Sequence, residues 1–377
     1  MRASTAHGGT RPLRVVQVSF HTDLARRAPE ELLEAWPTLS RVACAVQSDG
    51  VDVTVVQAAH TGETIVRDSV TYHFVHDARG RHDRVIQRAA SLSPDVVHVQ
   101  GLGFARAMRP LGRSVSRAPV FVQDHGAVPP RGWRALAWRW AYAHIAGVSF
   151  TASAQADPWK AAGILKRALP VFAVLEGSTD FNPGNQDAAR TATGMSGDPC
   201  VFWTGRLNAN KDPLTALAAF ERAAEQLPDA RLWCCFGDAP MLDIVRQRIA
   251  SSSTLAPRVA LLGNRPHAEL EARYRAADFF LQTSHREGSG YSLLEALACG
   301  TTPLVTDIPA ARQIVADAGA LTPVGDAMAL AAVIVDWSRR ERASLRLEAR
   351  ARFDAALTFD AIGKQLRATY EALTVAS

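Results

Sequence analysis

Short apolar segments that alternate with helical segments are the feature of this chain that most constrains its fold. The first, Leu13–Ser19, is a continuous apolar run, and 277–282 is another that ends in polar residues. A run of this kind, four to eight residues long and without strict alternation, is typical of a buried strand. Strands in alternation with helices predict parallel, doubly wound sheets. The sequence therefore predicts an α/β fold.

The expected elements fall into two similar series. In the first half we expect strands at 13–19, 51–57, 71–75 (an edge strand), 94–100, 119–123, 148–153 and 171–175, and helices at 30–47, 81–92 and 133–145. In the second half we expect strands at 200–204, 231–236, 258–262, 277–282 and 302–306, with helices after Pro213, after 236, at 267–277, before Gly300 and at 359–373.

Length and turn composition predict two domains. A chain of 377 residues is longer than one ordinary hydrophobic core, and residues 178–199 are rich in polar and turn residues. We predict a Rossmann-like domain over 1–185, a linker over 186–199, and a second Rossmann-like domain over 200–354. The amphipathic C-terminal helix, about 355–377, is expected to pack back on the first domain. Two domains joined by one linker predict a ligand cleft between them.

Composition indicates an ordinary soluble protein of the cytoplasm. The chain is 47% hydrophobic and 21% charged, which excludes a disordered chain. No apolar run reaches the roughly 18 residues of a membrane span, and Met1–Thr10 lacks the apolar core of a secretory signal. The five cysteines show no metal-ligand spacing, so we expect buried thiols in a reducing compartment.

Charge is distributed unevenly along the chain. Residues 1–185 contain 21 Lys and Arg against 15 Asp and Glu, a net charge of +6, and the remainder contains 21 against 22, which gives the total of +5. A basic N-terminal half suits an anionic acceptor or a membrane surface. It has no dense basic cluster with interleaved aromatic residues, so no nucleic-acid partner is expected.

Two carboxylates bracket the glycine-containing loop of 284–300. Glu287 precedes Gly288 and Gly290, and Glu295 lies inside the helix that follows. The bare backbone at the glycines lets a phosphate approach the N–H groups of the helix start, while a carboxylate accepts paired hydrogen bonds from sugar hydroxyls. Because ligands of open α/β sheets bind at the carboxyl ends of strands, this loop predicts a nucleotide-sugar site.

An alternative interpretation assigns both carboxylates to structure. Ser292 and Glu295 have the spacing of a capping box, so Glu295 would merely close the helix on itself. Glu287 would then be a solvated loop residue, as most exposed glutamates are.

A second motif favours the binding interpretation. Gly205, Arg206 and Lys211 follow the first strand of the second domain, at the same strand-end face. An arginine fork grips two phosphate oxygens and a lysine supplies a compact charge, so the pair suits a diphosphate. Alone, two such cations are usually solvated; beside the bracketed loop, they complete a site with two cations and two carboxylates.

These motifs resemble those of the retaining glycosyltransferases of family 4, which have the GT-B fold of two Rossmann-like domains facing across a cleft. Glu287 and Glu295 form the Glu-x7-Glu pattern of that family, and Gly205–Lys211 looks like its diphosphate motif. Residues 94–99 (PDVVHV) and 176–180 (EGSTD) resemble a strand and a turn of the family. The similarity covers nearly the whole chain and is specific over 200–326.

The resemblance implies roles for individual residues. Arg206 and Lys211 would hold the diphosphate, Glu287 the transferred sugar and Glu295 the ribose, while His125 matches a histidine near the reacting centre. By itself, His125 would be interpreted as a structural residue at a strand end. The predicted catalytic residues are His125, Arg206, Lys211 and Glu287; the predicted donor-binding residues are Gly205, Arg206, Lys211, Gly263, Arg265, Glu287, Gly288, Ser289, Gly290, Tyr291, Ser292 and Glu295.

One departure from the family pattern concerns the acceptor. Members usually carry a Gly-Gly loop after the first strand, where this chain has Ser19-Phe20-His21-Thr22-Asp23. His21 and Asp23 are therefore the acceptor candidates. Either the acceptor is unusual, or the loop binds differently, or activity has been lost.

The sequence predicts a metal-independent, retaining hexosyltransferase of the cytoplasm that uses a nucleoside-diphosphate sugar and no cofactor. No metal site is expected, because the chain has no Asp-x-Asp pair. The acceptor is a sugar, a lipid-linked molecule or a small molecule. The alternatives are another GT-B enzyme, either a nucleotide-sugar epimerase or a phosphorolytic enzyme, and a nucleotide-sugar-binding subunit with weak catalysis, because fold alone does not decide function.

The helix expected at 133–145 has two faces. Trp133, Leu136, Ala137, Trp140 and Ala141 have the spacing of a buried face, which leaves Arg131, Arg134, Trp138 and Tyr142 on the exposed one. Such an exposed face suits an anionic acceptor or peripheral contact with an anionic membrane. The alternative is an ordinary solvated face with one exposed tryptophan.

Overall fold

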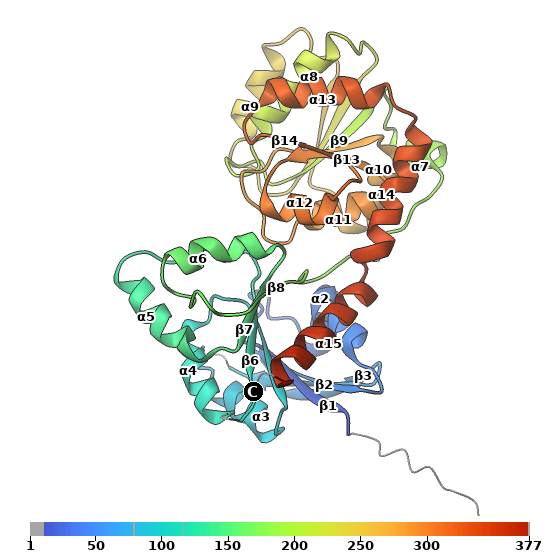
Figure 1. The fold of residues 1–377 in the computed structure, drawn as a ribbon. Coiled ribbons are helices and arrows are strands. Elements are labelled where there is room, and N and C mark those ends of the chain that lie inside the picture. Colours follow the sequence, from blue (N-terminus) through green and yellow to red (C-terminus); the bar gives the residue numbers. More distant parts are fainter. Residues whose placement is uncertain (1–10, 78–79, 116, 376–377) are drawn as a thin grey trace, which may run out of the picture. The chain divides into compact units, whose positions relative to one another are not determined.

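The computed structural model describes residues 11–77, 80–115 and 117–375. The chain divides into two compact units, unit 1 (Met1–Gly177 with Phe359–Ser377) and unit 2 (Ser178–Thr358). The segment 1–10, predicted to lack a secretory signal, lies outside the described residues, and so do the last two residues of the predicted C-terminal helix. Each unit has its own parallel sheet, which confirms the predicted α/β class (Figure 1).

The described part of unit 1 contains an eight-stranded sheet and the helices that surround it. The strands are β1 (Leu13–Ser19), β2 (Val51–Ala59), β3 (Glu63–Arg67), β4 (Val70–His76), β5 (Val96–Gln100), β6 (Val120–Gln123), β7 (Gly147–Phe150) and β8 (Val171–Ala173). The helices are α1 (Pro29–Ala35), α2 (Pro37–Val46), α3 (Asp83–Ser91), α4 (Ala105–Ser114), α5 (Trp133–Ala141), α6 (Asp157–Ala161) and α15 (Phe359–Val375), with 3₁₀ turns at Tyr142–His144 and Ser153–Ala156.

The sheet of unit 1 has the order β3-β4-β2-β1-β5-β6-β7-β8 and is parallel except for the antiparallel pair β3–β4. The prediction of 71–75 as an edge strand is wrong, because β4 lies inside the sheet and β3 forms the edge. β3 escapes detection because only Ile65 in it is buried, so it has no apolar run.

The helix expected over 30–47 is in fact two helices. α1 ends at Ala35 and α2 begins at Pro37, with Trp36 between them at φ −119° and ψ 78°. Proline cannot donate to the preceding turn and disfavours the helical conformation in the residue before it, so the helix breaks at this position.

Helices cover both faces of the unit 1 sheet, with α2 and α15 on one face and α4 and α5 on the other (Figure 1). The C-terminal helix α15 approaches α2 closely at Gly363, where a Cβ atom would lie 2.1 Å from the carbonyl oxygen of Ala45. Arg367 of α15 donates to the same carbonyl at 2.5 Å and so caps the C-terminal end of α2. α15 is therefore an integral part of unit 1.

The prediction of the buried face of α5 is wrong for its large side chains, although Ala141 is buried as predicted. Trp133, Leu136 and Trp140 are exposed, whereas Trp138 stacks on the buried Trp159 with ring centroids 5.9 Å apart. Tyr142, placed on the exposed side by the sequence, is buried and donates to the carbonyl of Leu102 at 2.5 Å. Both faces carry tryptophan, so periodicity alone did not distinguish them.

Unit 2 contains a six-stranded sheet in the order β11-β10-β9-β12-β13-β14, with every neighbouring pair parallel. The strands are β9 (Cys200–Gly205), β10 (Arg231–Phe236), β11 (Val259–Gly263), β12 (Phe279–Gln282), β13 (Thr302–Thr306) and β14 (Ala320–Thr322). The helices are α7 (Gln186–Thr193), α8 (Pro213–Ala224), α9 (Leu242–Ala250), α10 (His267–Ala276), α11 (Tyr291–Ala298), α12 (Pro309–Val315), α13 (Ala327–Ser338) and α14 (Arg342–Ala356). The predicted linker, 186–199, contains α7.

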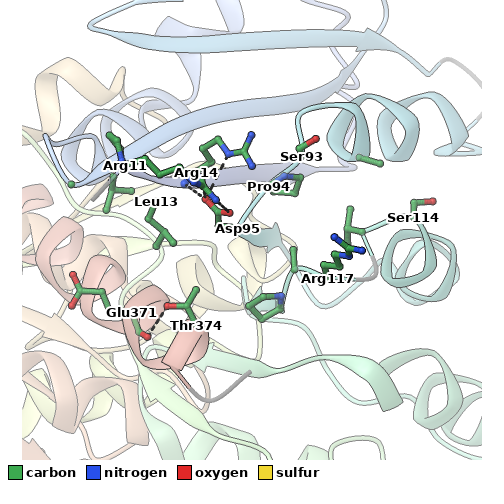
Figure 2. Close-up of a pocket in the computed structure, with 17 residues that line it drawn as sticks. Arg11, Leu13, Arg14, Ser93, Pro94, Asp95, Ser114, Arg117, Glu371 and Thr374 are labelled. Atoms are coloured by element: carbon green, nitrogen blue, oxygen red, sulfur yellow. Dashed lines mark hydrogen bonds and ion pairs between the residues drawn. The ribbon is translucent and has the colours of Figure 1, made fainter. Parts of the chain in front are cut away.

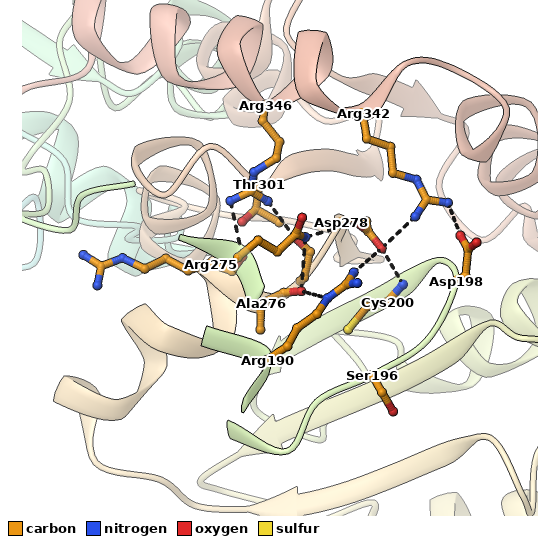
Figure 3. Close-up of polar contacts among 12 residues, drawn as sticks. Arg190, Ser196, Asp198, Cys200, Arg275, Ala276, Asp278, Thr301, Arg342 and Arg346 are labelled. Carbon is orange, nitrogen blue, oxygen red and sulfur yellow. Dashed lines mark hydrogen bonds and ion pairs between the residues drawn. The ribbon is translucent and has the colours of Figure 1, made fainter. Parts of the chain in front are cut away.

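A buried carboxylate joins the peripheral helices of unit 2 to the start of its central strands (Figure 3). Asp278, just before β12, accepts from Arg190 of α7 at 2.9 Å, from Arg342 of α14 at 3.1 Å and from the backbone N–H of Cys200 at 2.7 Å. Arg346 of α14 donates to the neighbouring carbonyl of residue 277 at 2.9 Å. Removal of one partner from a buried ion pair typically lowers the free energy of unfolding by about 3–5 kcal/mol. The cluster therefore fixes α7 and α14 to the amino edge of the sheet.

A cavity of about 1010 Å³ opens at the amino edge of the unit 1 sheet (Figure 2). Two of its lining arginines are engaged: Arg11 forms two hydrogen bonds of 2.8 Å with Asp95, and the backbone N–H of Arg14 donates to the same carboxylate at 2.9 Å. This edge is opposite to the carboxyl ends of the unit 1 strands, where the predicted site residues of unit 1, His21, Asp23 and His125, lie.

Two further observations concern the chain as a whole. Cys44 is exposed, so the prediction that all cysteines are buried is wrong for this residue, whereas Cys200, Cys234, Cys235 and Cys299 are buried. Within the described ranges, no helix combines the length and the apolar character that crossing a membrane requires.

Candidate functional site

The predicted motifs of unit 2 meet at two central strands. β9 ends at Gly205 and β12 ends at Gln282, and the two strands are parallel neighbours. From β9 the chain continues to β10 and β11 on one side and then crosses to β12 on the other. The loops after β9 and β12 thus leave the same edge in opposite directions, and this switch point is where open α/β sheets bind ligands.

Hydrogen bonds hold these two loops together. The N–H of His285 donates to the carbonyl of Asn210 at 2.8 Å, and the side chain of Asn210 donates to the carbonyl of Arg286 at 2.9 Å. The hydroxyl of Thr283 donates to the carbonyl of Lys211 at 2.8 Å. The loops therefore form one structural element, although about 70 residues of sequence lie between them.

Lys211 and Glu287 form an ion pair across the two loops. Lys211 Nζ lies 2.5 Å from Glu287 Oε1, and the two side chains are only 16% and 13% exposed. The side-chain amide of Gln282, at the end of β12, lies 3.4 Å from the same carboxylate oxygen. Arg206 directly follows β9 and is exposed at the same edge. One lysine, one arginine and one carboxylate are thus brought to the end of β9 and β12.

The helix after the second loop begins at a glycine in a backbone conformation that favours glycine. Gly290 is the N-cap of α11 and has a φ of +67°, a conformation that side chains disfavour. A Cβ atom there would also lie 2.9 Å from Ile314 Cδ1. Gly288, Ser289, Tyr291 and Ser292 surround this start, which carries the positive end of the helix dipole.

Glu295 is buried inside α11 and is held by two side chains. Tyr274 donates its hydroxyl to Glu295 Oε2 at 2.9 Å, and His267 Nε2 lies 2.7 Å from Oε1. The hydrogen bond to Glu295 raises the pKa of His267, and burial with the nearby Glu295 raises that of Tyr274 well above its usual value. Because the N-cap is Gly290, Ser292 is not a capping residue, and the capping-box alternative for Glu295 is not observed.

Two predicted donor residues lie farther along the same edge. Gly263 ends β11 with a φ of +71°, and the exposed Arg265 follows it just before α10. Among the described contacts, no hydrogen bond or ion pair joins Arg265 to the other predicted donor residues. α10 contributes His267 and Tyr274, which the sequence analysis missed, and His267 also stacks on Phe181 with centroids 4.8 Å apart. The position of His267 after a strand end was the available signal.

In unit 1, His125 lies between two polar side chains beyond the end of β6. His125 Nδ1 is 2.7 Å from Glu176 Oε2, and Nε2 is 2.8 Å from the side-chain oxygen of Gln100. Gln100 ends β5, the strand next to β6. The ring is therefore held by two contacts and remains about one-third exposed.

A buried polar chain connects His125 to the C-terminal helix. The amide nitrogen of Gln100 is 3.5 Å from His98 Nε2, and His98 Nδ1 is 2.7 Å from the hydroxyl of Tyr370 on α15. Burial lowers the pKa of His98 to about 3, so this ring is neutral near pH 7 and both donates and accepts. Sequence analysis missed this series of polar contacts, although His98 and Gln100 are polar residues two positions apart on one face of an apolar strand.

The loop after β1 presents its two acceptor candidates differently. Asp23 is buried: its carboxylate accepts from the backbone N–H of Arg27 at 2.9 Å and pairs with the Arg27 guanidinium at 3.1 Å. The backbone hydrogen bond from Arg27 holds the pKa of Asp23 below its usual value. His21 is exposed, with its ring 5.5 Å from that of Trp36. The Asp23 side chain thus stabilises the loop through its contacts with Arg27, whereas the His21 side chain is exposed to solvent.

The two motif-bearing loops lie within a segment of the chain that matches a known protein family. Residues 185–354 match the family described as "Glycosyl transferases group 1". This group 1 match spans most of unit 2, including both motif loops and α11.

Curated relatives carry names from the same class of enzyme. The D-inositol 3-phosphate glycosyltransferase of Mycolicibacterium smegmatis is 33% identical over 193 residues, which are 48% of this chain and 43% of that protein. The GDP-mannose:cellobiosyl-diphosphopolyprenol alpha-mannosyltransferase of Xanthomonas oryzae is 23% identical over 60% of each chain. The chain thus spans less than two-thirds of the length of either relative.

Solved structures share the fold over nearly the whole chain. A sucrose-phosphate synthase from Thermosynechococcus elongatus has a TM-score of 0.67 at 19% identity and covers 97% of this chain and 100% of its own. HepE of Anabaena, solved in complex with UDP, has a TM-score of 0.68 at 17% identity and covers 96% and 100%. The fold is therefore GT-B, with two Rossmann-like units.

Proposed function

We propose that this protein is a retaining glycosyltransferase that transfers a sugar from a nucleoside-diphosphate sugar to an acceptor hydroxyl. The observation that carries the proposal is that hydrogen bonds join the loops after β9 and β12, and that Lys211 and Glu287 form an ion pair of 2.5 Å between these loops. The group 1 match over the same residues and the UDP complex of a structural neighbour support it.

In the proposed reaction, the bond from the sugar C1 atom to the diphosphate oxygen breaks and a bond from C1 to the acceptor oxygen forms. The proton of the acceptor hydroxyl passes to the departing diphosphate oxygen, on which negative charge builds up as its bond to C1 breaks. Arg206 and Lys211 would meet that charge with fixed cations, and the start of α11 at Gly290 would meet it with backbone dipoles. Charge stabilisation of this kind requires no metal ion and no cofactor.

Glu287 and Glu295 are each assigned to bind a different sugar of the donor. Glu287 lies beside Lys211, so it would accept hydrogen bonds from the transferred sugar next to the diphosphate. Glu295 lies about one turn into α11 between His267 and Tyr274, where it would accept from the ribose hydroxyls. His125 and the exposed His21 belong to unit 1, to which we assign the acceptor. Retention of configuration rests on the Glu-x7-Glu resemblance.

Acceptor-dependent release of nucleoside diphosphate tests the proposal. UDP- and GDP-sugars would be combined with phosphorylated polyols, lipid diphosphates and simple sugars, and product configuration would be read from the anomeric proton coupling. We expect release only when donor and acceptor are both present, with an unchanged anomeric configuration. Inversion would refute retention, and epimerised donor without acceptor would identify an epimerase.

A second candidate, a nucleotide-sugar-binding subunit, is favoured by one observation. The loop after β1 lacks the paired glycines of the resembled family, and its Asp23 carboxylate is engaged within the loop. Donor binding without turnover across every acceptor class would support this candidate against the transferase.

A further inference from the structure

The exposed face of α5 carries a stripe of large apolar side chains. Trp133, Leu136 and Trp140 occupy positions i, i+3 and i+7, and they are 78%, 68% and 62% exposed. Exposed tryptophans on one helix face are unusual for a surface that meets only water, because each leaves a large apolar area hydrated. We name this set the tryptophan stripe.

Arginines flank the tryptophan stripe on both sides. At 100° per residue, Arg134 and Arg139 fall on opposite sides of the stripe, and both are exposed. Arg109 of the adjacent α4 places its guanidinium 3.3 Å from the ring centroid of Trp140. A cation over an indole face keeps the ring presented at the surface while it adds charge to the rim.

The surrounding sequence has almost no negative charge. Residues 96–156 contain a single acidic residue, the buried Asp124, and no lysine. Within the described residues, no ion pair involves any arginine of this segment. The arginines are Arg106, Arg109, Arg113, Arg117, Arg131, Arg134 and Arg139.

We propose that the tryptophan stripe and its flanking arginines dock unit 1 on an anionic lipid surface. Tryptophan prefers the boundary between headgroups and acyl chains, and unpaired arginines are attracted to anionic headgroups. The flanking Arg109, Arg134 and Arg139 distinguish a lipid surface from a second copy of the chain, because two copies of this face would bring the same positive charges together and repel each other. The proposal is independent of the glycosyltransferase activity.

Co-sedimentation of the full chain with vesicles tests this docking surface. Vesicles of phosphatidylcholine alone would be compared with vesicles that also contain phosphatidylglycerol, at low and high salt. We expect binding only to the anionic vesicles and weaker binding at high salt, because salt screens the arginines. Equal binding to both compositions, or no binding at low salt, would overturn the proposal.

Variants on the two parts of the surface give separate readouts. Trp133→Ser with Trp140→Ser should reduce the partition coefficient about tenfold or more, as expected from loss of apolar burial. Arg134→Gln with Arg139→Gln should reduce it about fivefold per arginine, and this loss should vanish at high salt. All four side chains are exposed, so thermal melts should match that of the wild type.

Matched controls use exposed residues elsewhere. Leu24→Ser with Val66→Ser removes apolar side chains from another part of unit 1, and Arg222→Gln with Arg246→Gln removes two charges from unit 2. Both controls should bind vesicles as the wild type does. Equal losses in the controls, or a concentration-dependent dimer that the tryptophan double variant abolishes, would assign the stripe to something other than lipid.

Discussion

Lys211→Met tests the ion pair at the centre of the proposed donor site. In the wild type, Lys211 Nζ lies 2.5 Å from Glu287 Oε1 with both side chains mostly buried. The variant removes the ammonium from the Glu287 carboxylate, while the side-chain amide of Gln282 still lies 3.4 Å from it. An under-satisfied buried polar group costs about 1–3 kcal/mol, so we expect a lower melting temperature.

Lys211→Met should lower both the melting temperature and the affinity for the nucleotide, and each effect has its own physical cause. In a unit of this size, each kcal/mol lowers the melting temperature by about 2–4 °C, so the stability effect is roughly 2–12 °C. Loss of a charged hydrogen bond to the diphosphate, about 1.5–3 kcal/mol, would raise the Kd of a nucleoside diphosphate about tenfold to a hundredfold. In turnover, loss of one such donor costs roughly 10²–10³ in rate.

The double variant Lys211→Met with Glu287→Gln separates the two effects. A neutral glutamine leaves no buried charge, so the double variant should regain most of the lost stability. Its affinity for UDP or GDP, measured by calorimetric titration, should remain low, because the cation is still missing. Lys364→Met, at an exposed position of α15, is the matched control. Wild-type affinity in Lys211→Met, or recovery of affinity in the double variant, would refute the reasoning.

Four further predictions follow from particular residues. Glu295→Gln should weaken binding of the nucleoside diphosphate itself, whereas Glu287→Gln should weaken only the intact nucleotide sugar; equal changes in both titrations would contradict the assignment. Activity should survive excess EDTA, and loss that Mg²⁺ reverses would argue against metal independence. Asp278→Ala should lower the free energy of unfolding by about 3–5 kcal/mol in a denaturant titration, and a change below about 1 kcal/mol would show that the cluster is dispensable. Burial lowers the pKa of His98 to about 3, so the unfolded chain binds a proton at this residue at a higher pH than the folded chain does. The free energy of unfolding should therefore fall by up to about 1.4 kcal/mol per pH unit between pH 6.5 and pH 3. His98→Gln should show a weaker dependence of stability on pH, and an unchanged dependence would contradict the assignment.

Local sequence patterns predicted the strands of the sheets well. β1, β10 and β13 have the predicted bounds, because each is a short segment rich in apolar residues with polar or turn residues at its ends. The strands β3 and β14 were missed, because β3 has only one buried residue and β14 is only three residues long. The two helices at 29–46 were merged because only Pro37, the first residue of α2, marks the break.

Contacts between distant residues could not be predicted in the same way. The pairing of Lys211 with Glu287 depends on β9 and β12 being neighbours, which is a property of strand order. The sequence indicated that both residues follow strands, and the resemblance placed them in one site, but neither specified an ion pair. His98 and Tyr370 are 272 residues apart, and their contact depends on where α15 packs.

The two faces of α5 show a third limit of sequence patterns. Large apolar side chains occupy both faces, so the spacing of Trp133, Leu136 and Trp140 fitted a buried face as well as an exposed one. The deciding interaction is the stack of Trp138 on Trp159, which comes from α6. Only the packed structure shows which tryptophans face solvent.

Hydrogen–deuterium exchange with and without nucleoside diphosphate tests the central claim most directly. The claim is that the nucleotide binds where the loops after β9 and β12 meet. With saturating UDP or GDP, we predict slower exchange in residues 206–212 and 284–292, and in α10 around His267. Protection confined to other segments, such as the amino-edge cavity of unit 1, would contradict the account, as would the absence of protection with either nucleotide.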